Sequence, residues 1–266
     1  MKKLLLLMIV AILVLAGCQS TTQEDSTAKE PLKVGMELKY PPFETKDENG
    51  KPAGASVMLA EALGVYLDRE IEIVETDYSS LIPALEQGNI DLIISSMTIT
   101  PAREEVVDFS NPYTNSQLMM LVYKDSKVMS PADLNDPDVI IASKTGTIGA
   151  LWAAEYAPKA QIKNIDEEAS AVLEVAQGNA DVFIYDPLSI IRHHDNYPDT
   201  TRAVLEPLPN TKGWGIALRK GEDELKGQLN DFIEKAKTDG TYEKIREKYL
   251  QDKIKEFDDN GLEFFF

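Results

Sequence analysis

Two stretches of the chain, about ninety positions apart, share one pattern of apolar and polar residues. In residues 79–96 and again in residues 169–186, a short segment with an apolar stripe at helical spacing leads into Gln-Gly-Asn and then a continuous apolar run. Gly88 and Gly178 suit the left-handed conformation that ends a helix. The apolar run is typical of a strand that is buried on both faces, and such strands belong to parallel α/β sheets. The pattern therefore predicts two similar helix–strand units.

Polar residues stand at the ends of both apolar runs. Ser95-Ser96 follow the first run, and Tyr185-Asp186 end the second. Ligands of parallel α/β sheets bind beyond the carboxyl ends of the strands. We therefore expect two α/β lobes that present polar groups to one cleft between them.

The rest of the chain alternates between strand and helix patterns, which favours an α/β fold. Two of the expected strands would cross between the lobes and work as a hinge. The further expected strands are Leu32–Met36, Ile71–Val74, Val139–Ala142 and the crossing strands Leu118–Tyr123 and Trp214–Leu218. The further expected helices are Gly54–Leu67, Ile148–Tyr156, one through Ile190-Ile191, and Glu222–Tyr249 with a break at Asp239-Gly240.

This order of elements divides the chain into two lobes and a tail. Residues 31–115 and 211–250 are expected to form lobe 1, and residues 116–210 to form lobe 2. Residues 251–266 combine an acidic turn with an aromatic terminus, which could dock on the protein or fray.

The N-terminus has the pattern of a processing signal. Lys2-Lys3 precede thirteen apolar residues, which are too few for a spanning helix of roughly 20. Leu15-Ala16-Gly17-Cys18 resembles a bacterial lipobox, in which Cys18 receives lipid, and an ordinary signal peptide is the alternative. We therefore expect a lipoprotein signal peptide over residues 1–17 and a flexible tether over residues 18–30.

Cysteine content and charge exclude several classes of protein. Cys18 is the single cysteine, so an internal disulfide is impossible, and Cys/His zinc spacing is absent. Removal of residues 1–17, which contain two lysines and no acidic residue, changes the formal net charge from −18 to −20. Such a charge argues against nucleic acid as a partner and against lying on an anionic membrane surface.

Arg103 and the residues before it suggest an anion site. Thr100-Pro101 is typical of an N-cap and a first helical position, which places Arg103 in the first turn. A cation there opposes the helix dipole, so the position favours a role facing an anion. A guanidinium binds a carboxylate through two parallel hydrogen bonds. The alternative is a surface arginine that pairs with the acidic residues at positions 104, 105 and 108.

The second lobe offers two helix starts. Gly146-Thr147 open a helix after a strand, and free amide groups at such a start attract anions. Asp186 precedes a proline that can begin a helix, so a capping role is an alternative to ligand binding.

Six segments, in this order and spacing, resemble the polar amino-acid-binding proteins that feed ABC importers, and the likeness covers roughly residues 31–250. The resemblance implies a two-lobed periplasmic-binding-protein-like fold, each lobe a mostly parallel sheet flanked by helices and joined by two hinge strands. The segments are Tyr40–Phe43, Leu81–Leu85, Met97–Arg103, Phe109–Tyr113, Asp133-Leu134 and Lys144–Thr147.

The resemblance also implies partners and a location. The protein would be a monomer outside the cytoplasm that captures a free L-amino acid, with a polar or cationic side chain, and delivers it to an ABC permease and its ATPase. It would use no cofactor or metal and would not be an enzyme. A lipid on Cys18 would anchor it to the outer face of the cytoplasmic membrane, most often in a Gram-positive envelope, or on the periplasmic face in a Gram-negative one.

Five residues match positions that hold the two charged α-groups of the ligand in this family. Arg103 would clamp the α-carboxylate with help from Thr147, and Thr98 would help to hold both α-groups. Asp186 and the backbone carbonyl of Ser96 would bind the α-ammonium group. Because Arg103 and Asp186 come from opposite lobes, only the closed form would make both contacts, and the ligand would shift the equilibrium toward closure.

The remaining matched positions would contact the ligand's side chain. Tyr40 and Tyr78 would enclose it between aromatic rings, and ordinary core tyrosines are the alternative. Glu37 would favour cationic or amide-bearing side chains. A solvated charge beside the neighbouring lysine is the alternative for Glu37. Lys144 and Tyr185 would line the walls of the same site.

Two other classes of function stay open. A few proteins of this fold are cyclohexadienyl dehydratases, and Glu37 could act as their acid. However, the sequence has no nucleophile constellation. His193-His194, on a helix expected at the surface, would point to different faces and serve poorly as joint metal ligands. The other alternative is a sensor that presents its amino acid to a receptor.

Overall fold

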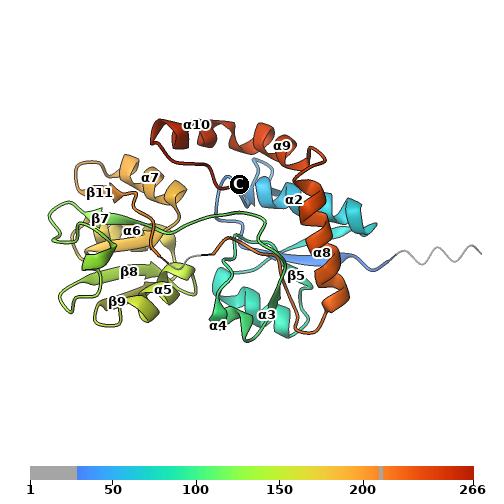
Figure 1. Cartoon of the computed structure of the whole chain (residues 1–266), viewed down its shortest axis with the longest axis horizontal. Helices are drawn as coiled ribbons and strands as arrows, with labels where there is room; N and C mark the ends of the chain where they lie inside the picture. Colours follow the sequence, from blue (N-terminus) through green and yellow to red (C-terminus); the bar gives the residue numbers. More distant parts are fainter. Residues whose placement is uncertain (1–28, 210–211) are drawn as a thin grey trace, which may run out of the picture.

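Two five-stranded sheets organise the computed structural model, which describes residues 29–209 and 212–266 (Figure 1). We call the sheet at the N-terminal side, with its helices, lobe 1 and the other lobe 2. The predicted signal peptide, Cys18 and most of the predicted tether lie outside the described residues. No helix among the described residues combines the length and apolar character needed to cross a membrane.

The sheet of lobe 1 has the strand order β4-β1-β5-β12-β6. β1 lies between β4 and β5 and is parallel to both, whereas β12 is antiparallel to β5 and to β6. Val34 and Met36 of β1 are fully buried, as expected for a central strand with helices on both faces. The strands are β1 (Leu32–Met36), β4 (Ile71–Glu75), β5 (Leu92–Ile93), β6 (Asp108–Phe109) and β12 (Ala217–Leu218).

The sheet of lobe 2 has the order β11-β7-β10-β8-β9. β8 is parallel to both β9 and β10, and β7 is antiparallel to β10 and β11. Each sheet thus combines three adjacent parallel strands with an antiparallel strand that enters from the hinge and an edge strand that pairs with that antiparallel strand. The strands are β7 (Met119–Tyr123), β8 (Ile140–Lys144), β9 (Gln161–Ile165), β10 (Val182–Tyr185) and β11 (Thr201–Val204).

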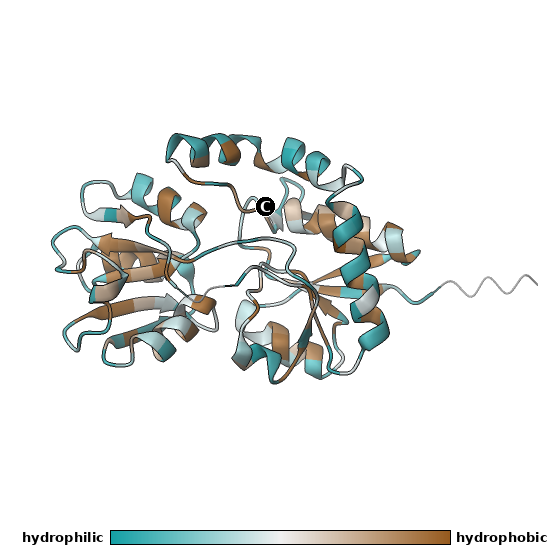
Figure 2. Cartoon of the chain, in the orientation of Figure 1, coloured by the Kyte–Doolittle hydropathy of each residue, from teal (hydrophilic) through white to brown (hydrophobic). Residues whose placement is uncertain are grey.

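Helices cover both sheets. Figure 2 shows apolar residues concentrated on the strands of both sheets, while α8 and α10 carry many hydrophilic residues. The helices are α2 (Ala55–Leu67), α3 (Leu81–Glu86), α4 (Pro101–Glu104), α5 (Ile148–Tyr156), α6 (Glu168–Ala176), α7 (Pro187–Asn196), α8 (Asp223–Ala236), α9 (Thr241–Ile245) and α10 (Gln251–Asp259). Short elements complete the chain: β2 (Thr45–Lys46), β3 (Pro52–Ala53), 3-10 turns at Tyr78–Ser80 and Pro131–Asp133, and a π-helical turn at Arg246–Leu250.

The two predicted helix–glycine–strand units are confirmed. α3 and α6 are followed by Gly88 and Gly178, whose φ angles of 74° and 75° lie in the left-handed region. The strands that follow are β5 and β10. The predicted strand Trp214–Leu218 is shorter than expected, because its first residues instead bond the loop after β5, with the Gly215 amide donating to the Met97 carbonyl at 3.0 Å.

The C-terminal tail docks on the protein. The predicted acidic turn is wrong, since residues 256–259 belong to α10. Beyond it, the aromatic end packs against the hinge region, with ring centroids of Phe265 and Trp214 5.3 Å apart and those of Phe266 and Phe43 5.9 Å apart. Phe266 is only 3% exposed. The tail therefore belongs to the core of lobe 1.

Candidate functional site

A cavity lies between the lobes at the carboxyl ends of their parallel strands, where the sequence predicted a cleft. Glu37 follows β1, Ser96 follows β5 and Asp186 follows β10. Both lobes and both crossing segments contribute to its walls. The lining residues are Glu37, Tyr40, Glu44, Tyr78, Ser95, Ser96, Thr98, Ser116, Gln117, Leu118, Thr147, Ile148, Tyr185, Asp186, Lys212 and Trp214.

Arg103 is held beside this cavity by its own helix cap and by carbonyl groups. The Thr100 hydroxyl accepts a hydrogen bond from the Arg103 amide at 3.2 Å, which fixes the start of α4. The guanidinium donates to the carbonyls of Thr98 at 2.6 Å and Gly146 at 2.9 Å, the latter across the lobes. It also contacts the Tyr78 hydroxyl at 3.4 Å. Because Arg103 is only 4% exposed, the alternative of a surface arginine paired with neighbouring acids is wrong.

Asp186 presents a buried carboxylate oxygen to the cavity. Its Oδ1 caps α7 by accepting from the Ser189 amide at 3.1 Å, whereas its Oδ2 has no hydrogen-bond partner among the described residues. The side chain is buried, and this burial raises the pKa of Asp186, although the nearby Tyr40 hydroxyl and the Ser189 amide lower it. Burial also raises the pKa of Tyr40 on the same wall, and the Asp186 charge adds to that effect. An unsatisfied buried oxygen of this kind is suited to receive a cationic donor.

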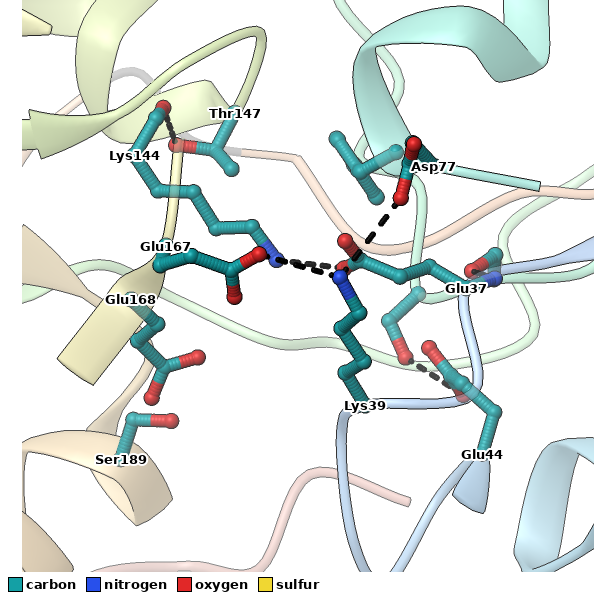
Figure 3. Close-up of polar contacts among 12 residues, drawn as sticks. Glu37, Lys39, Glu44, Asp77, Lys144, Thr147, Glu167, Glu168 and Ser189 are labelled. Atoms are coloured by element: carbon teal, nitrogen blue, oxygen red, sulfur yellow. Dashed lines mark hydrogen bonds and ion pairs between the residues drawn. The ribbon is translucent and has the colours of Figure 1, made fainter. Parts of the chain in front are cut away.

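A buried ion pair joins the lobes next to the cavity. The Lys144 ammonium of lobe 2 contacts Oε2 of Glu37 in lobe 1, and it lies 5.6 Å from the centre of the Tyr78 ring (Figure 3). The Ser95 hydroxyl accepts from the Glu37 amide at 2.9 Å. Glu37 is therefore no solvated charge beside Lys39. Lys39 instead reaches across the lobes to Glu167 at 3.1 Å, at an exposed position.

Glu44 is a cavity residue that the sequence analysis missed. It is 1% exposed, and its Oε2 accepts from the Ser96 hydroxyl at 3.1 Å (Figure 3). Burial raises the pKa of Glu44 to about 8, although the hydroxyls of Ser56 and Ser96 lower it. A carboxyl group with such a pKa is largely protonated at neutral pH.

A tight turn places Glu44 in the cavity. The Tyr40 amide donates a hydrogen bond to the Glu44 carbonyl at 2.8 Å, and the Glu44 amide donates to the Tyr40 carbonyl at 3.0 Å. The chain therefore folds back within four residues. The carbonyls of Pro42 and Phe43 then accept from the first amides of α2. Gly54 permits this approach, because a Cβ atom there would lie 2.2 Å from the Phe43 carbonyl oxygen.

Eight of the ten predicted binding residues line the cavity, and Arg103 and Lys144 contact the lining. Ser96 has a φ of 48°, unusual for a residue with a side chain, at the point where the chain turns away from β5. The Thr147 hydroxyl donates to the Lys144 carbonyl at 2.8 Å rather than accepting from its own helix. Their roles in binding stay predictions.

The expected surface position of the histidine pair is wrong for His193. This ring is buried and its Nε2 lies 2.6 Å from Oε1 of Glu168, which also contacts Arg192 at 2.6 Å. The imidazole and guanidinium partners, together with Lys144, lower the pKa of Glu168 against the opposing effect of burial. Among the described residues, no group of three or more His, Cys, Asp or Glu side chains is arranged to hold a metal ion.

Fold and cavity together define a two-lobed ligand-binding protein. Residues 32–252 match the bacterial extracellular solute-binding proteins, family 3, and the chain belongs to that family. This confirms the resemblance carried by the sequence motifs. The L-arginine-binding protein of Pseudomonas aeruginosa is 32% identical over an alignment of 266 positions, and the alignment covers 94% of this chain and 97% of that relative.

Solved structures agree with the fold. An ancestral arginine-binding protein bound to arginine is 32% identical, covers 84% of this chain and 99% of its own, and has a TM-score of 0.73. An ancestral arginine-binding protein bound to glutamine is 33% identical, covers 84% of this chain and 98% of its own, and has a TM-score of 0.72. The ancestral amino acid-binding protein AncCDT-1, a precursor of cyclohexadienyl dehydratase, is 37% identical, covers 83% of this chain and 95% of its own, and has a TM-score of 0.70.

Proposed function

We propose that the protein captures a free L-amino acid in the cavity between its lobes and delivers it to an ABC importer. Arg103 would bind the α-carboxylate and Asp186 the α-ammonium group. One observation carries this assignment: Asp186 lines the cavity with a buried Oδ2 that has no hydrogen-bond partner among the described residues, while a guanidinium from the other lobe contacts Thr98 and Tyr78 of the same wall. A zwitterion would satisfy both groups at once.

Closure follows from the same geometry. Arg103 already reaches the Gly146 carbonyl of lobe 2, and Lys144 reaches Glu37 of lobe 1, so the contacts between lobes surround the ligand position. An amino acid held at both α-groups would add contacts that exist only when the lobes meet. Binding would therefore shift the population toward the closed form that a permease recognises.

The state of Glu37 argues against the dehydratase role that the sequence left open for this residue. A dehydratase needs an acid that can give its proton to the substrate, and here Glu37 is paired with the Lys144 ammonium. We also propose that the protein acts as a monomer, held at the outer face of the cytoplasmic membrane by a lipid on Cys18. Mass spectrometry of the membrane-extracted protein would test the lipid.

A screen of the twenty amino acids by thermal shift tests the function, because a ligand that binds only the folded state raises its melting temperature. With the ligand found, calorimetry of Arg103→Ala and Asp186→Asn should show affinity losses of about 2–5 kcal/mol. The asparagine keeps an oxygen for the α7 cap, so folding should be little affected. Asp195→Asn, exposed on the same helix, is the control. Near-native affinity in both variants would refute the assignment.

A further inference from the structure

Glu44 is the one acid of the cavity wall, within the described residues, that forms no ion pair and that the proposed function leaves unused. In that function Asp186 answers the α-ammonium group and Arg103 the α-carboxylate. Glu37 is neutralised by Lys144. Lys212, the other cation at the wall, is 56% exposed in its side chain and pairs with Glu104 at 3.3 Å.

The surroundings of Glu44 explain why its charge is costly in the empty cavity. Ser56 on α2 and Ser96 after β5 face it with hydroxyl groups only. The charged groups that act on it are Glu37, which disfavours its ionisation, and Lys144, which is already engaged by Glu37. Tyr113, a buried phenol, also lies within electrostatic range. A buried carboxyl without a cation stays protonated.

We propose that Glu44 is the counter-charge for a cationic side chain of the ligand: it keeps its proton while the cavity is empty or holds an uncharged side chain, and it loses that proton to solvent when a cationic side chain enters. The inference rests on the proposed function and names its substrate class, L-amino acids with a cationic side chain such as arginine or lysine. The cavity is then electrically balanced with either kind of ligand. With a protonated Glu44 it matches a neutral amide, and with an ionised Glu44 it matches a cation.

This exchange makes cation binding depend on pH in a defined direction. A cation binds the ionised form, so each pH unit below the raised pKa, which is about 8, should weaken arginine affinity by roughly tenfold. Glutamine, an uncharged side chain of comparable length, needs no such ionisation. The raised pKa of Asp186 affects both ligands equally, because both present the same α-ammonium group, so the difference between the ligands reports on Glu44.

Calorimetry of the wild-type protein at pH 7 in phosphate and in Tris, whose ionisation enthalpies differ, counts the protons released. The protein should release about one proton more when it binds arginine than when it binds glutamine. Glu44→Gln should abolish this difference and weaken arginine binding at least tenfold while glutamine still binds. Glu48→Gln, an exposed acid four residues further along, should behave as wild type.

The wild-type measurement stands alone if Glu44→Gln fails to fold. Equal proton counts for arginine and glutamine would overturn the inference, as would a wild-type protein that binds glutamine but neither arginine nor lysine. The inference also fails if a folded Glu44→Gln still releases the extra proton. A wild-type protein that binds no amino acid would instead refute the proposed function, which is a separate result.

Discussion

Arg103 of lobe 1 and Asp186 of lobe 2 carry opposite charges, and they differ in how completely the protein satisfies those charges. In lobe 1, the Arg103 guanidinium already donates to the carbonyls of Thr98 and Gly146. In lobe 2, Asp186 Oδ2 has no partner among the described residues. Lobe 1 thus offers a fixed cation, whereas lobe 2 offers an acceptor that an incoming ammonium group would complete.

The cores of the lobes differ as well. The clusters of lobe 2 draw their buried residues from Leu118 to Leu208, a single stretch of chain. The main cluster of lobe 1 joins β1 and α2 to Leu229 of α8, Phe257 of α10 and the terminal Phe266, and it also takes in Leu188 and Ile191 of α7. The core of lobe 2 is therefore built from one continuous stretch of chain, whereas lobe 1 depends on the last residues of the chain to complete its core.

The largest expected effect tests this difference in cores. Phe266→Ala should lower the free energy of unfolding of lobe 1 by about 3–5 kcal/mol, because it removes a buried ring that packs on Phe43, Tyr113 and Tyr242. Phe183→Ala, in β10, makes the matching change in lobe 2. Urea denaturation followed by tryptophan fluorescence measures both, since Trp214 lies in lobe 1 and Trp152 in lobe 2.

Phe264→Ala, at a half-buried ring of the same tail, should cost less than Phe266→Ala. If the free energy of unfolding of Phe266→Ala lay within about 1 kcal/mol of the wild-type value, the tail would not be part of the lobe 1 core. The contrast between the continuous core of lobe 2 and the core of lobe 1 that needs the chain end would then fail.

The next effect concerns the charge that passes between the lobes. Lys144→Met leaves Glu37 buried without its cation, and removing one partner of such a pair typically costs about 2–5 kcal/mol. Because the pair joins residues of different lobes, we expect the cost to appear as opening of the ligand-free protein rather than as unfolding. Small-angle scattering should show a larger radius of gyration for the variant.

Glu37→Gln combined with Lys144→Met removes both charges and should return the protein toward the closed dimensions. If Lys144→Met kept the wild-type radius of gyration, the pair would contribute nothing to closure.

Local patterns explain how much of the fold the sequence could predict. Strand Leu32–Met36 and helix Ile148–Tyr156 have the predicted bounds, because their apolar positions and flanking residues act within a few positions. Strand β9 and the helical part of the tail were missed. β9 has only half-buried and exposed residues at the sheet edge, and α10 is mostly polar, so neither has a strong apolar signal.

The site divides along the same line. The neighbouring residues predicted a helix cap at Thr100 and gave a cap as one of two alternatives for Asp186. Both side chains accept the expected hydrogen bond from a backbone amide. Glu44 follows directly on the aromatic segment Tyr40–Phe43, yet its place in the cavity depends on a turn that stacks on α2. The pairing of Glu37 with Lys144 joins residues 107 positions apart across two lobes, which no local pattern encodes.

The smallest expected effect tests whether the fixed cation of lobe 1 depends on its cap. Thr100→Ala removes the hydroxyl that accepts a hydrogen bond from the Arg103 backbone amide, and it should lower the free energy of unfolding by about 1 kcal/mol. Thr100→Ser keeps the hydroxyl and should unfold as wild type. Because Arg103 is also held by the Thr98 and Gly146 carbonyls, we expect ligand affinity in Thr100→Ala to fall less than in Arg103→Ala. Chemical denaturation and calorimetry on the same samples separate the two quantities. A full loss of binding in a folded Thr100→Ala would mean that the cap, and not the carbonyl pair, positions the guanidinium.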